Sequence, residues 1–152
     1  MVERDGHEPD AARGVDPRGV RFAAAMTSAV LAIGLVTGSP RVLLAQAILF
    51  GLCAAFGLQF NPYGVAYRRT LQPRLAPPTE LESAGPLRFS QGVGCVFASL
   101  GALGYATGAT MVGTVATSCA LAAALLNAVF GVCVGCHLYL ALASVRRRVS
   151  AT

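Results

Sequence analysis

The sequence predicts an all-α protein, an integral membrane four-helix bundle, on the basis of three observations. Of its 152 residues, 55% are hydrophobic and 12% are charged, whereas an ordinary soluble domain carries about a quarter charged residues. The apolar residues form three runs without Asp, Glu, Lys or Arg, at 22–40, 42–67 and 89–145. A helix of about 20 residues crosses a bilayer core of about 30 Å, and such continuous runs differ from the alternating strands of a membrane barrel.

The three runs supply four membrane spans. The first two runs give one span each, separated by a short turn at Gly38-Ser39-Pro40-Arg41. The third run is too long for one span, and we expect it to fold back between Gly108 and Gly113, because glycine takes the backbone angles of a tight turn. The predicted spans are residues 22–38, 42–60, 89–109 and 113–143, within a transmembrane domain that covers 21–145.

Arginine placement predicts the orientation of these spans. All twelve basic residues are arginines, and only Arg41 lies between the first and second spans. The positive-inside rule therefore places both termini and the middle loop, 61–88, in the cytoplasm. We expect the N-terminal tail, 1–20, to be flexible and the C-terminal tail, 146–152, to be basic. The middle loop is expected to be extended, because four prolines fall between residues 67 and 88.

A weak internal repeat relates the two halves of the chain. Arg21-Phe22 opens the first span as Arg88-Phe89 opens the third, and residues 50–53 (FGLC) recur as residues 130–133 (FGVC). This similarity favours two helical hairpins in the same orientation, a parallel repeat, with chance as the alternative. Glycines four residues apart permit close helix packing, within the chain or in a homo-oligomer; they are Gly34 with Gly38, Gly104 with Gly108 and Gly131 with Gly135.

Four of the five cysteines are expected in one layer near the cytoplasmic ends of the helices. With a rise of about 1.5 Å per residue, Cys53, Cys95, Cys133 and Cys136 lie at similar depth, while Cys119 lies alone towards the other side. Cys133 and Cys136 are three residues apart, at a separation that a disulfide tolerates. We predict that Cys133 and Cys136 form a redox-active or sulfur-accepting pair, with Cys53 and Cys95 as resolving or supporting thiols. The alternative is that the cysteines only pack as small hydrophobic side chains.

No cofactor and no metal is expected. Residues 133–137 spell C-x-x-C-H, the attachment signature of a c-type haem, but they are predicted to lie inside a span at its cytoplasmic end. Zinc held by four thiolates would leave net negative charge in the bilayer without a nearby arginine. The predicted spans contain no Asp, Glu, Lys or Arg, which argues against an ion-coupled transporter. The few polar residues in the spans, such as Asn127, are expected to form interhelical hydrogen bonds.

Several motifs carry a resemblance to a known family. They include Asp16-Pro17-Arg18-Gly19, Asn61-Pro62-Tyr63-Gly64 and, most specific, F-G-x-C-x-G-C at residues 130–136. The chain resembles an uncharacterised family of small four-helix integral membrane proteins from bacteria, of actinobacterial type. The resemblance implies a location in the bacterial inner membrane. It also implies thiol or sulfur handling in company with thioredoxin-like proteins and sulfurtransferases.

The predicted function is thiol–disulfide or sulfur-transfer chemistry at a cytoplasm-facing cysteine pair. As an enzyme, the protein would be a membrane thiol–disulfide oxidoreductase that exchanges with a soluble thiol protein or a quinone. Two alternatives are a noncatalytic accessory or assembly subunit with structural cysteines, and a channel for sulfur compounds. The expected partners are the lipid bilayer, a cytoplasmic thioredoxin-like or sulfurtransferase protein and a second copy of the chain, with no nucleic acid.

Overall fold

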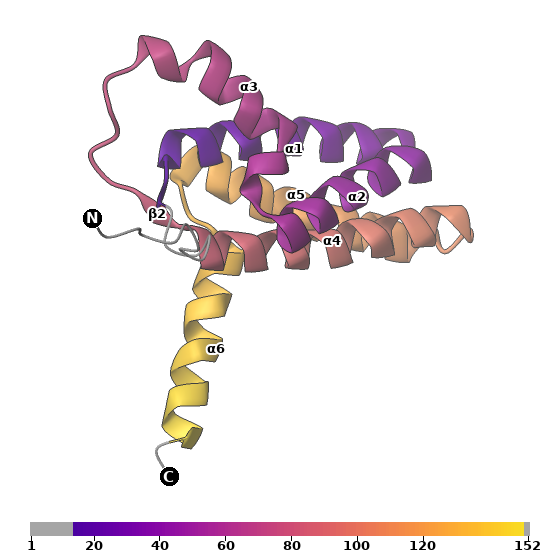
Figure 1. Ribbon diagram of the computed structural model, residues 1–152. Coiled ribbons are helices and arrows are strands. Elements are labelled where there is room, and N and C mark those ends of the chain that lie inside the picture. The colour runs from indigo at the N-terminus through magenta and orange to yellow at the C-terminus, as the bar shows by residue number, and fades with distance from the viewer. Residues whose placement is uncertain (1–13, 151–152) are drawn as a thin grey trace, which may run out of the picture.

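The computed structural model describes residues 14–150, which are mostly helical (Figure 1). The all-α prediction is confirmed. The expectations for residues 1–13 and 151–152 lie outside the described part of the chain. The α-helices are α1 (Pro17–Thr37), α2 (Pro40–Phe56), α3 (Pro62–Thr70), α4 (Ala84–Ala106), α5 (Thr110–Phe130) and α6 (Val134–Ser150). The shorter elements are the 3-10 turns η2 (Leu58–Phe60) and η3 (Gln72–Arg74) and the antiparallel strands β1 (Gly14–Val15) and β2 (Glu82–Ser83).

Three helices begin with the same local signal, a capping residue followed by proline. Asp16, Ser39 and Asn61 precede α1, α2 and α3, and a proline at the first helical position has a suitable φ and lacks an N–H that would be unpaired there. An Asp16 carboxylate oxygen accepts the N–H of Arg18 at 2.9 Å. The side-chain oxygen of Asn61 accepts the N–H of Tyr63 at 3.0 Å. These bonds satisfy exposed amide groups of the first turn and fix where α1 and α3 start.

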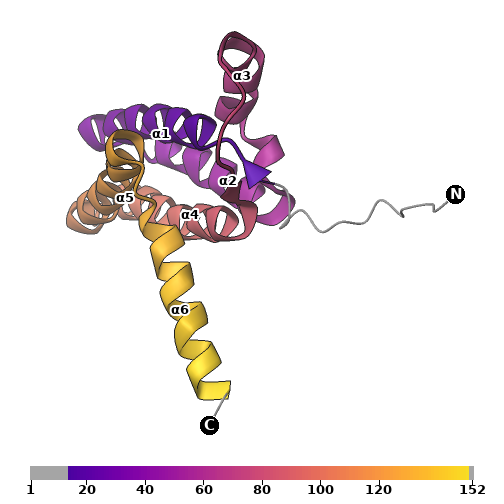
Figure 2. The ribbon, with the colours of Figure 1, turned by 90° about the vertical axis from the view of Figure 1, so that its left-hand side faces the viewer.

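Helices α1, α2, α4 and α5 lie side by side in a bundle (Figures 1 and 2). Helix α1 packs chiefly against α5 and α2 chiefly against α4, while α4 also packs against α5. Leu31 and Leu43 are fully buried, and alanines fill much of the remaining core. A Cβ added at Gly104 would lie 2.4 Å from the backbone nitrogen of Gly113. The backbones of α4 and α5 are therefore in contact there, as small residues allow.

The outward side of the bundle is apolar. Large hydrophobic side chains are exposed along each of its four helices, and Val36 and Met111 are 86% and 83% exposed. Helices α1 and α5 are long and apolar enough to cross a membrane, and α2 is a shorter apolar helix. Large exposed apolar patches mark contact sites for a membrane or another protein.

The prediction of one helix over residues 113–143 was wrong. Helix α5 ends at Phe130, and Gly131 takes a left-handed conformation with φ of 68° while its N–H donates to the Asn127 carbonyl. Helix α6 then begins at Val134 and points away from the bundle (Figures 1 and 2). Hydropathy gives no sign of this break, because the apolar run continues through it. The local signal is Gly131, because many helices end at a glycine in the left-handed conformation.

Other boundaries also differ from the prediction. The middle segment 61–88 is not wholly extended, since it contains α3, and α4 begins at Ala84 instead of residue 89. Residues 14–20 form β1 and the start of α1, and residues 146–150 are the last part of α6 instead of a separate tail. Helix α2 ends at Phe56, four residues earlier than expected, where Gly57 follows with φ of 108°.

Each half of the chain contains two long helices followed by a helix that points away from them. Arg21, near the start of α1, donates to the last carbonyls of α5, and Arg88, near the start of α4, donates to the last carbonyls of α2. The acceptors are Ala128 and Val129 for Arg21, and Ala54 and Ala55 for Arg88. By these contacts, residues 54–57 of the first half correspond to residues 128–131 of the second half. The sequence had instead suggested that residues 50–53 correspond to residues 130–133. Each arginine sits at the negative end of a helix from the other half.

Candidate functional site

Cys133 immediately precedes α6, and Cys136 lies in the first turn of that helix. The Cys133 carbonyl accepts the N–H of His137 at 3.1 Å, and its Sγ accepts the N–H of Cys136 at 3.3 Å. The sulfur therefore faces the positive end of the α6 dipole, where unpaired amide groups favour a negative charge. Cysteines at helix N-termini form the reactive thiolate more readily than cysteines in apolar surroundings.

Ser90 of α4 also contacts the Cys133 sulfur. The Cys133 thiol donates to Ser90 Oγ, with 3.3 Å between sulfur and oxygen. Gly135, between the two cysteines, packs directly on the same residue: a Cβ added there would lie 2.7 Å from the Cα, Cβ and Oγ of Ser90. The start of α6 is therefore docked on α4 at the cysteine pair.

Cys133 and Cys136 are both free cysteines, and their sulfur atoms lie side by side, within reach of a disulfide bond. Both side chains are partly exposed. The pair predicted from the sequence is thus together in space, but at the start of a helix instead of within one. That difference gives the pair its amide contact and its access to the surface.

The other three cysteines lie apart from this pair. Cys53 is fully buried in α2, and Cys95 packs into a small apolar cluster between α2 and α4. Neither lines the cavity described below, whereas Cys119, expected to lie alone, does. Within residues 14–150, no three His, Cys, Asp or Glu side chains lie close enough to share a metal ion. The expected layer of four thiols therefore does not form a cluster within residues 14–150.

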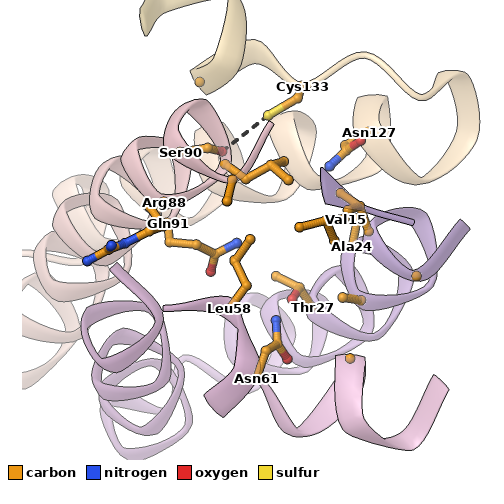
Figure 3. Close-up of a pocket in the computed structure, with 18 of the residues that line it drawn as sticks. Val15, Ala24, Thr27, Leu58, Asn61, Arg88, Ser90, Gln91, Asn127 and Cys133 are labelled. Carbon is orange, nitrogen blue, oxygen red and sulfur yellow. Dashed lines mark hydrogen bonds between the residues drawn. The ribbon is translucent and has the colours of Figure 1, made fainter. Parts of the chain in front are cut away.

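A cavity of about 630 Å³ lies beside Cys133, between the starts of α1 and α4, the end of α5 and the segment that follows α2 (Figure 3). This volume is in the range of small-molecule binding sites. Much of the wall is apolar and includes Val20, Leu58, Leu87, Val93, Phe97 and several alanines. The uncharged polar residues of the wall include Thr27, Asn61, Ser90, Gln91 and Asn127.

Several of these polar groups face the cavity without a partner among residues 14–150. Figure 3 shows the amides of Asn61, Gln91 and Asn127 directed inward from different walls. Thr27 and Asn61 are only 7% and 8% exposed, and Oε1 of Gln91 is buried without a hydrogen-bond partner among the described residues. Since an unpaired buried polar atom is costly, the cavity offers hydrogen bonds that the described protein groups leave unused.

Each charged side chain in the cavity wall forms hydrogen bonds with other groups of the protein. Arg88 donates to the α2 carbonyls, and Arg68 donates to a backbone carbonyl at 3.4 Å. Asp16 caps α1 and also accepts the O–H of Tyr67 at 3.1 Å. Burial, and next the hydrogen bond to Asp16, raises the pKa of Tyr67, so the phenol remains a donor at neutral pH. The groups left free in the wall are mostly neutral.

Ser90, Gln91 and Thr27 were not predicted as site residues. The available signal was that each is a polar residue in or beside an apolar run, where such residues need a partner. Asn127 was expected to bond between helices, but its amide makes no hydrogen bond within residues 14–150 and faces the cavity instead. The sequence could not show that these side chains converge, because they come from different helices.

The fold and the site define a class of protein: an all-helical protein with an apolar bundle surface, a cysteine pair at a helix start and an adjoining cavity. The chain belongs to the family described as Domain of unknown function (DUF4395), whose model matches residues 15–144. The prediction of an uncharacterised family is confirmed. Comparison with the curated proteins and with the solved structures finds no match.

Proposed function

We propose that this protein is a multi-pass membrane thiol–disulfide oxidoreductase whose reacting groups are the sulfurs of Cys133 and Cys136. The observation that carries the proposal is the bond from the Cys136 N–H to Cys133 Sγ at the start of α6. It stabilises a thiolate on Cys133, which makes Cys133 the attacking sulfur. Cys136 is within reach to resolve a mixed disulfide on Cys133.

The exchange reaction balances without a further reagent. A thiolate of a cytoplasmic thioredoxin-like dithiol attacks Cys133 Sγ of the disulfide form, and the bond to Cys136 breaks with Cys136 leaving as a thiolate. The second partner thiolate then attacks the partner sulfur of the mixed disulfide and releases Cys133 as a thiolate. Two electrons and two protons pass to the Cys133–Cys136 pair, and the partner becomes a disulfide.

We place α1, α2, α4 and α5 across the bacterial inner membrane. Two observations support this arrangement: α1 and α5 have the length and hydropathy of membrane spans, and the outward side chains of all four helices are largely apolar. Arg21, Arg68 and Arg88 lie at the end of the bundle that carries Cys133, whereas Arg41 follows the turn at the opposite end. The positive-inside rule assigns the Cys133 end and both termini to the cytoplasm.

Helix α6 fits the surface of that membrane. It leaves the bundle crosswise at the Cys133 end (Figures 1 and 2), and Arg146, Arg147 and Arg148 lie near its end. Apolar residues recur on one helical face at intervals of three or four. They are Val134, Leu138, Leu142, Val145 and Val149, all exposed. A helix of this kind lies along the lipid interface with its apolar face buried.

Trapping of a mixed disulfide tests the proposal. The probe is a thioredoxin-like protein that has a single active-site cysteine activated by thionitrobenzoate, which a thiolate displaces. The Cys136→Ser variant in detergent should release thionitrobenzoate and form the mixed disulfide at least about tenfold faster than the Cys133→Ser variant, because only Cys133 lies at the helix N-terminus.

The Cys133→Ser, Cys136→Ser double variant is the matched control, since it retains the other three cysteines. Equal rates in all three variants would assign the reaction to those cysteines and contradict the proposal. That result would favour the noncatalytic accessory role, in which Cys133 and Cys136 only pack.

A further inference from the structure

We propose that the cavity beside Cys133 binds the ring of an isoprenoid quinone, which oxidises the Cys133–Cys136 dithiol. This inference rests on the proposed function and supplies its oxidant. Cys133 forms part of the cavity wall, and Figure 3 shows its sulfur directed towards Ser90, which also lines the cavity. A ligand in the cavity therefore lies next to the residue assigned to attack.

The polar side chains of the cavity wall that have no partner among residues 14–150, such as Gln91 Oε1 and the Asn127 amide, are uncharged. Arg88, Arg68 and Asp16 lie in the wall, but each already binds a backbone group, and Asp16 also binds Tyr67. A sulfur oxyanion or a phosphate would need a free cation or a cluster of backbone N–H groups. The cavity instead presents amide and hydroxyl groups between apolar side chains. An uncharged molecule with hydrogen-bond acceptors fits such a wall.

The amide groups are placed to hold carbonyl oxygens. The Asn61 side-chain oxygen caps α3 by accepting the Tyr63 N–H, so its amide N–H₂ is the group left to donate. Gln91 and Asn127 bring two further amides from α4 and α5 (Figure 3). Each amide has an N–H₂ group that can donate, and the unpaired Oε1 of Gln91 can accept an O–H of the hydroquinone form. A quinone carries two carbonyl oxygens on opposite sides of its ring. Donors on separate walls match that geometry.

Two further features fit a quinone: the apolar part of the cavity wall and the redox chemistry of the cysteine pair. Leu58, Leu87 and Phe97 provide apolar surface for the ring and the first part of an isoprenoid chain. A quinone dissolves in the bilayer, which the apolar outer surface of the bundle is proposed to contact. It also accepts two electrons and two protons, the same number that a dithiol releases on forming a disulfide.

The oxidation step balances in atoms and electrons. The Cys133 thiolate adds to a ring carbon and forms a C–S bond, and a ring oxygen takes up a proton. Cys136, as a thiolate, then attacks Cys133 Sγ, so that the S–S bond forms and the C–S bond breaks with its electron pair going to the ring. A second proton reaches the other oxygen, and the products are the disulfide and a hydroquinone.

Quinone binding is tested first in a protein that lacks the Cys133–Cys136 pair, so that this pair cannot reduce the quinone. The Cys133→Ser, Cys136→Ser protein in detergent is titrated with a short-chain ubiquinone analogue by equilibrium dialysis. We expect saturable binding of one quinone. Gln91→Leu added to this protein should weaken binding by about tenfold or more, because one or two hydrogen bonds are lost. Gln46→Leu, a span glutamine outside the cavity wall, is the matched control and should leave binding unchanged.

The thiols are then followed in the reduced wild-type protein. Anaerobic addition of the same quinone should form one disulfide per hydroquinone, slowed in Gln91→Leu but not in Gln46→Leu. Thermal unfolding identifies a variant that fails to fold. In that case the binding test is the thermal unfolding midpoint of the wild-type protein, which bound quinone should raise.

The outcomes separate the two proposals. Thiol exchange by the wild type without saturable quinone binding, or with binding that Gln91→Leu leaves intact, overturns the quinone site alone. Saturable binding with no reaction of Cys133 or Cys136, with either quinone or the activated thioredoxin-like probe, overturns the oxidoreductase proposal and with it the electron transfer proposed here.

Discussion

The thiol of Cys133 and the hydroxyl of Ser90 lie 3.3 Å apart, sulfur to oxygen, and join the start of α6 to α4. This contact links residues 43 positions apart in the sequence. The same serine is covered by Gly135. Ser90 thus holds both the reacting sulfur and the helix that supplies its amide contact, and several expected results follow from this arrangement.

Gly135→Ala should separate Cys133 from Ser90. The added Cβ would lie 2.7 Å from the Ser90 backbone Cα, so α6 must shift, as overpacking costs about 1–3 kcal/mol. We expect a lower thermal midpoint and a slower reaction of Cys133 with the activated probe. Gly92→Ala in α4 is the control, since its added Cβ meets nothing within 4 Å. Equal effects of the two substitutions would contradict the docked position of α6.

Ser90→Ala should slow alkylation of Cys133 without unfolding the protein. In a Cys136→Ser background, the Ser90 hydroxyl can rotate and donate to the thiolate, and loss of one hydrogen bond corresponds to about three- to tenfold in rate. The measurement is the iodoacetamide rate at pH 7, with the modified residue identified by mass spectrometry. Ser99→Ala on the same helix should leave this rate unchanged.

Removal of Arg88 should destabilise the bundle more than removal of Arg21. Arg88 is half-buried and makes three hydrogen bonds to α2 carbonyls, whereas Arg21 is exposed and makes two to α5 carbonyls. We expect Arg88→Gln to cost about 1.5–3 kcal/mol in unfolding free energy and Arg21→Gln to cost less, both measured by thermal or chemical unfolding in detergent. Arg69→Gln in α3 is the control. If Arg88→Gln costs no more than Arg69→Gln, the helix-capping role is wrong.

Tyr67 should make stability fall at alkaline pH. Its pKa is raised above the ordinary value of 10.0, first by burial and then by Asp16. A raised folded pKa means that the folded state favours the neutral phenol, so this stabilisation is complete below about pH 10 and is lost as the pH rises through the folded pKa. Tyr67→Phe should unfold at a lower temperature than wild type at pH 8, and the difference should shrink above pH 10. Parallel curves from pH 8 to 11 would refute this assignment.

The sequence predicted the helical class for reasons that are local, whereas it placed the starts of the first two spans at residues 22 and 42 and did not predict α3. Long uncharged runs identify the bundle helices, and a capping residue before proline marks the starts at Asp16, Ser39 and Asn61. The turn at Gly108 was also predicted, and this glycine has φ of 80°. Such features depend on a few neighbouring residues and so are visible without coordinates.

The site was only partly predictable, because it depends on contacts between distant segments. The sequence indicated the Cys133 and Cys136 pair, but a continuous apolar run concealed the helix end at Gly131, which converts Cys133 into the residue that starts α6. The glycines four residues apart were read as packing residues, and Gly38 and Gly108 also as turn residues. In the structure Gly38, Gly108 and Gly131 adopt positive φ, whereas Gly34, Gly104 and Gly135 are the ones in close contact.

A redox titration of the cysteines tests the central claim most directly. The wild-type protein in lipid nanodiscs is equilibrated with reduced and oxidised dithiothreitol at a series of ratios and quenched with acid, and each cysteine is quantified by differential alkylation and mass spectrometry. The account predicts that Cys133 and Cys136 lose reactivity together in one two-electron transition while Cys53, Cys95 and Cys119 keep theirs. Cys133 and Cys136 remaining thiols at every ratio, or becoming oxidised independently of each other, would contradict it.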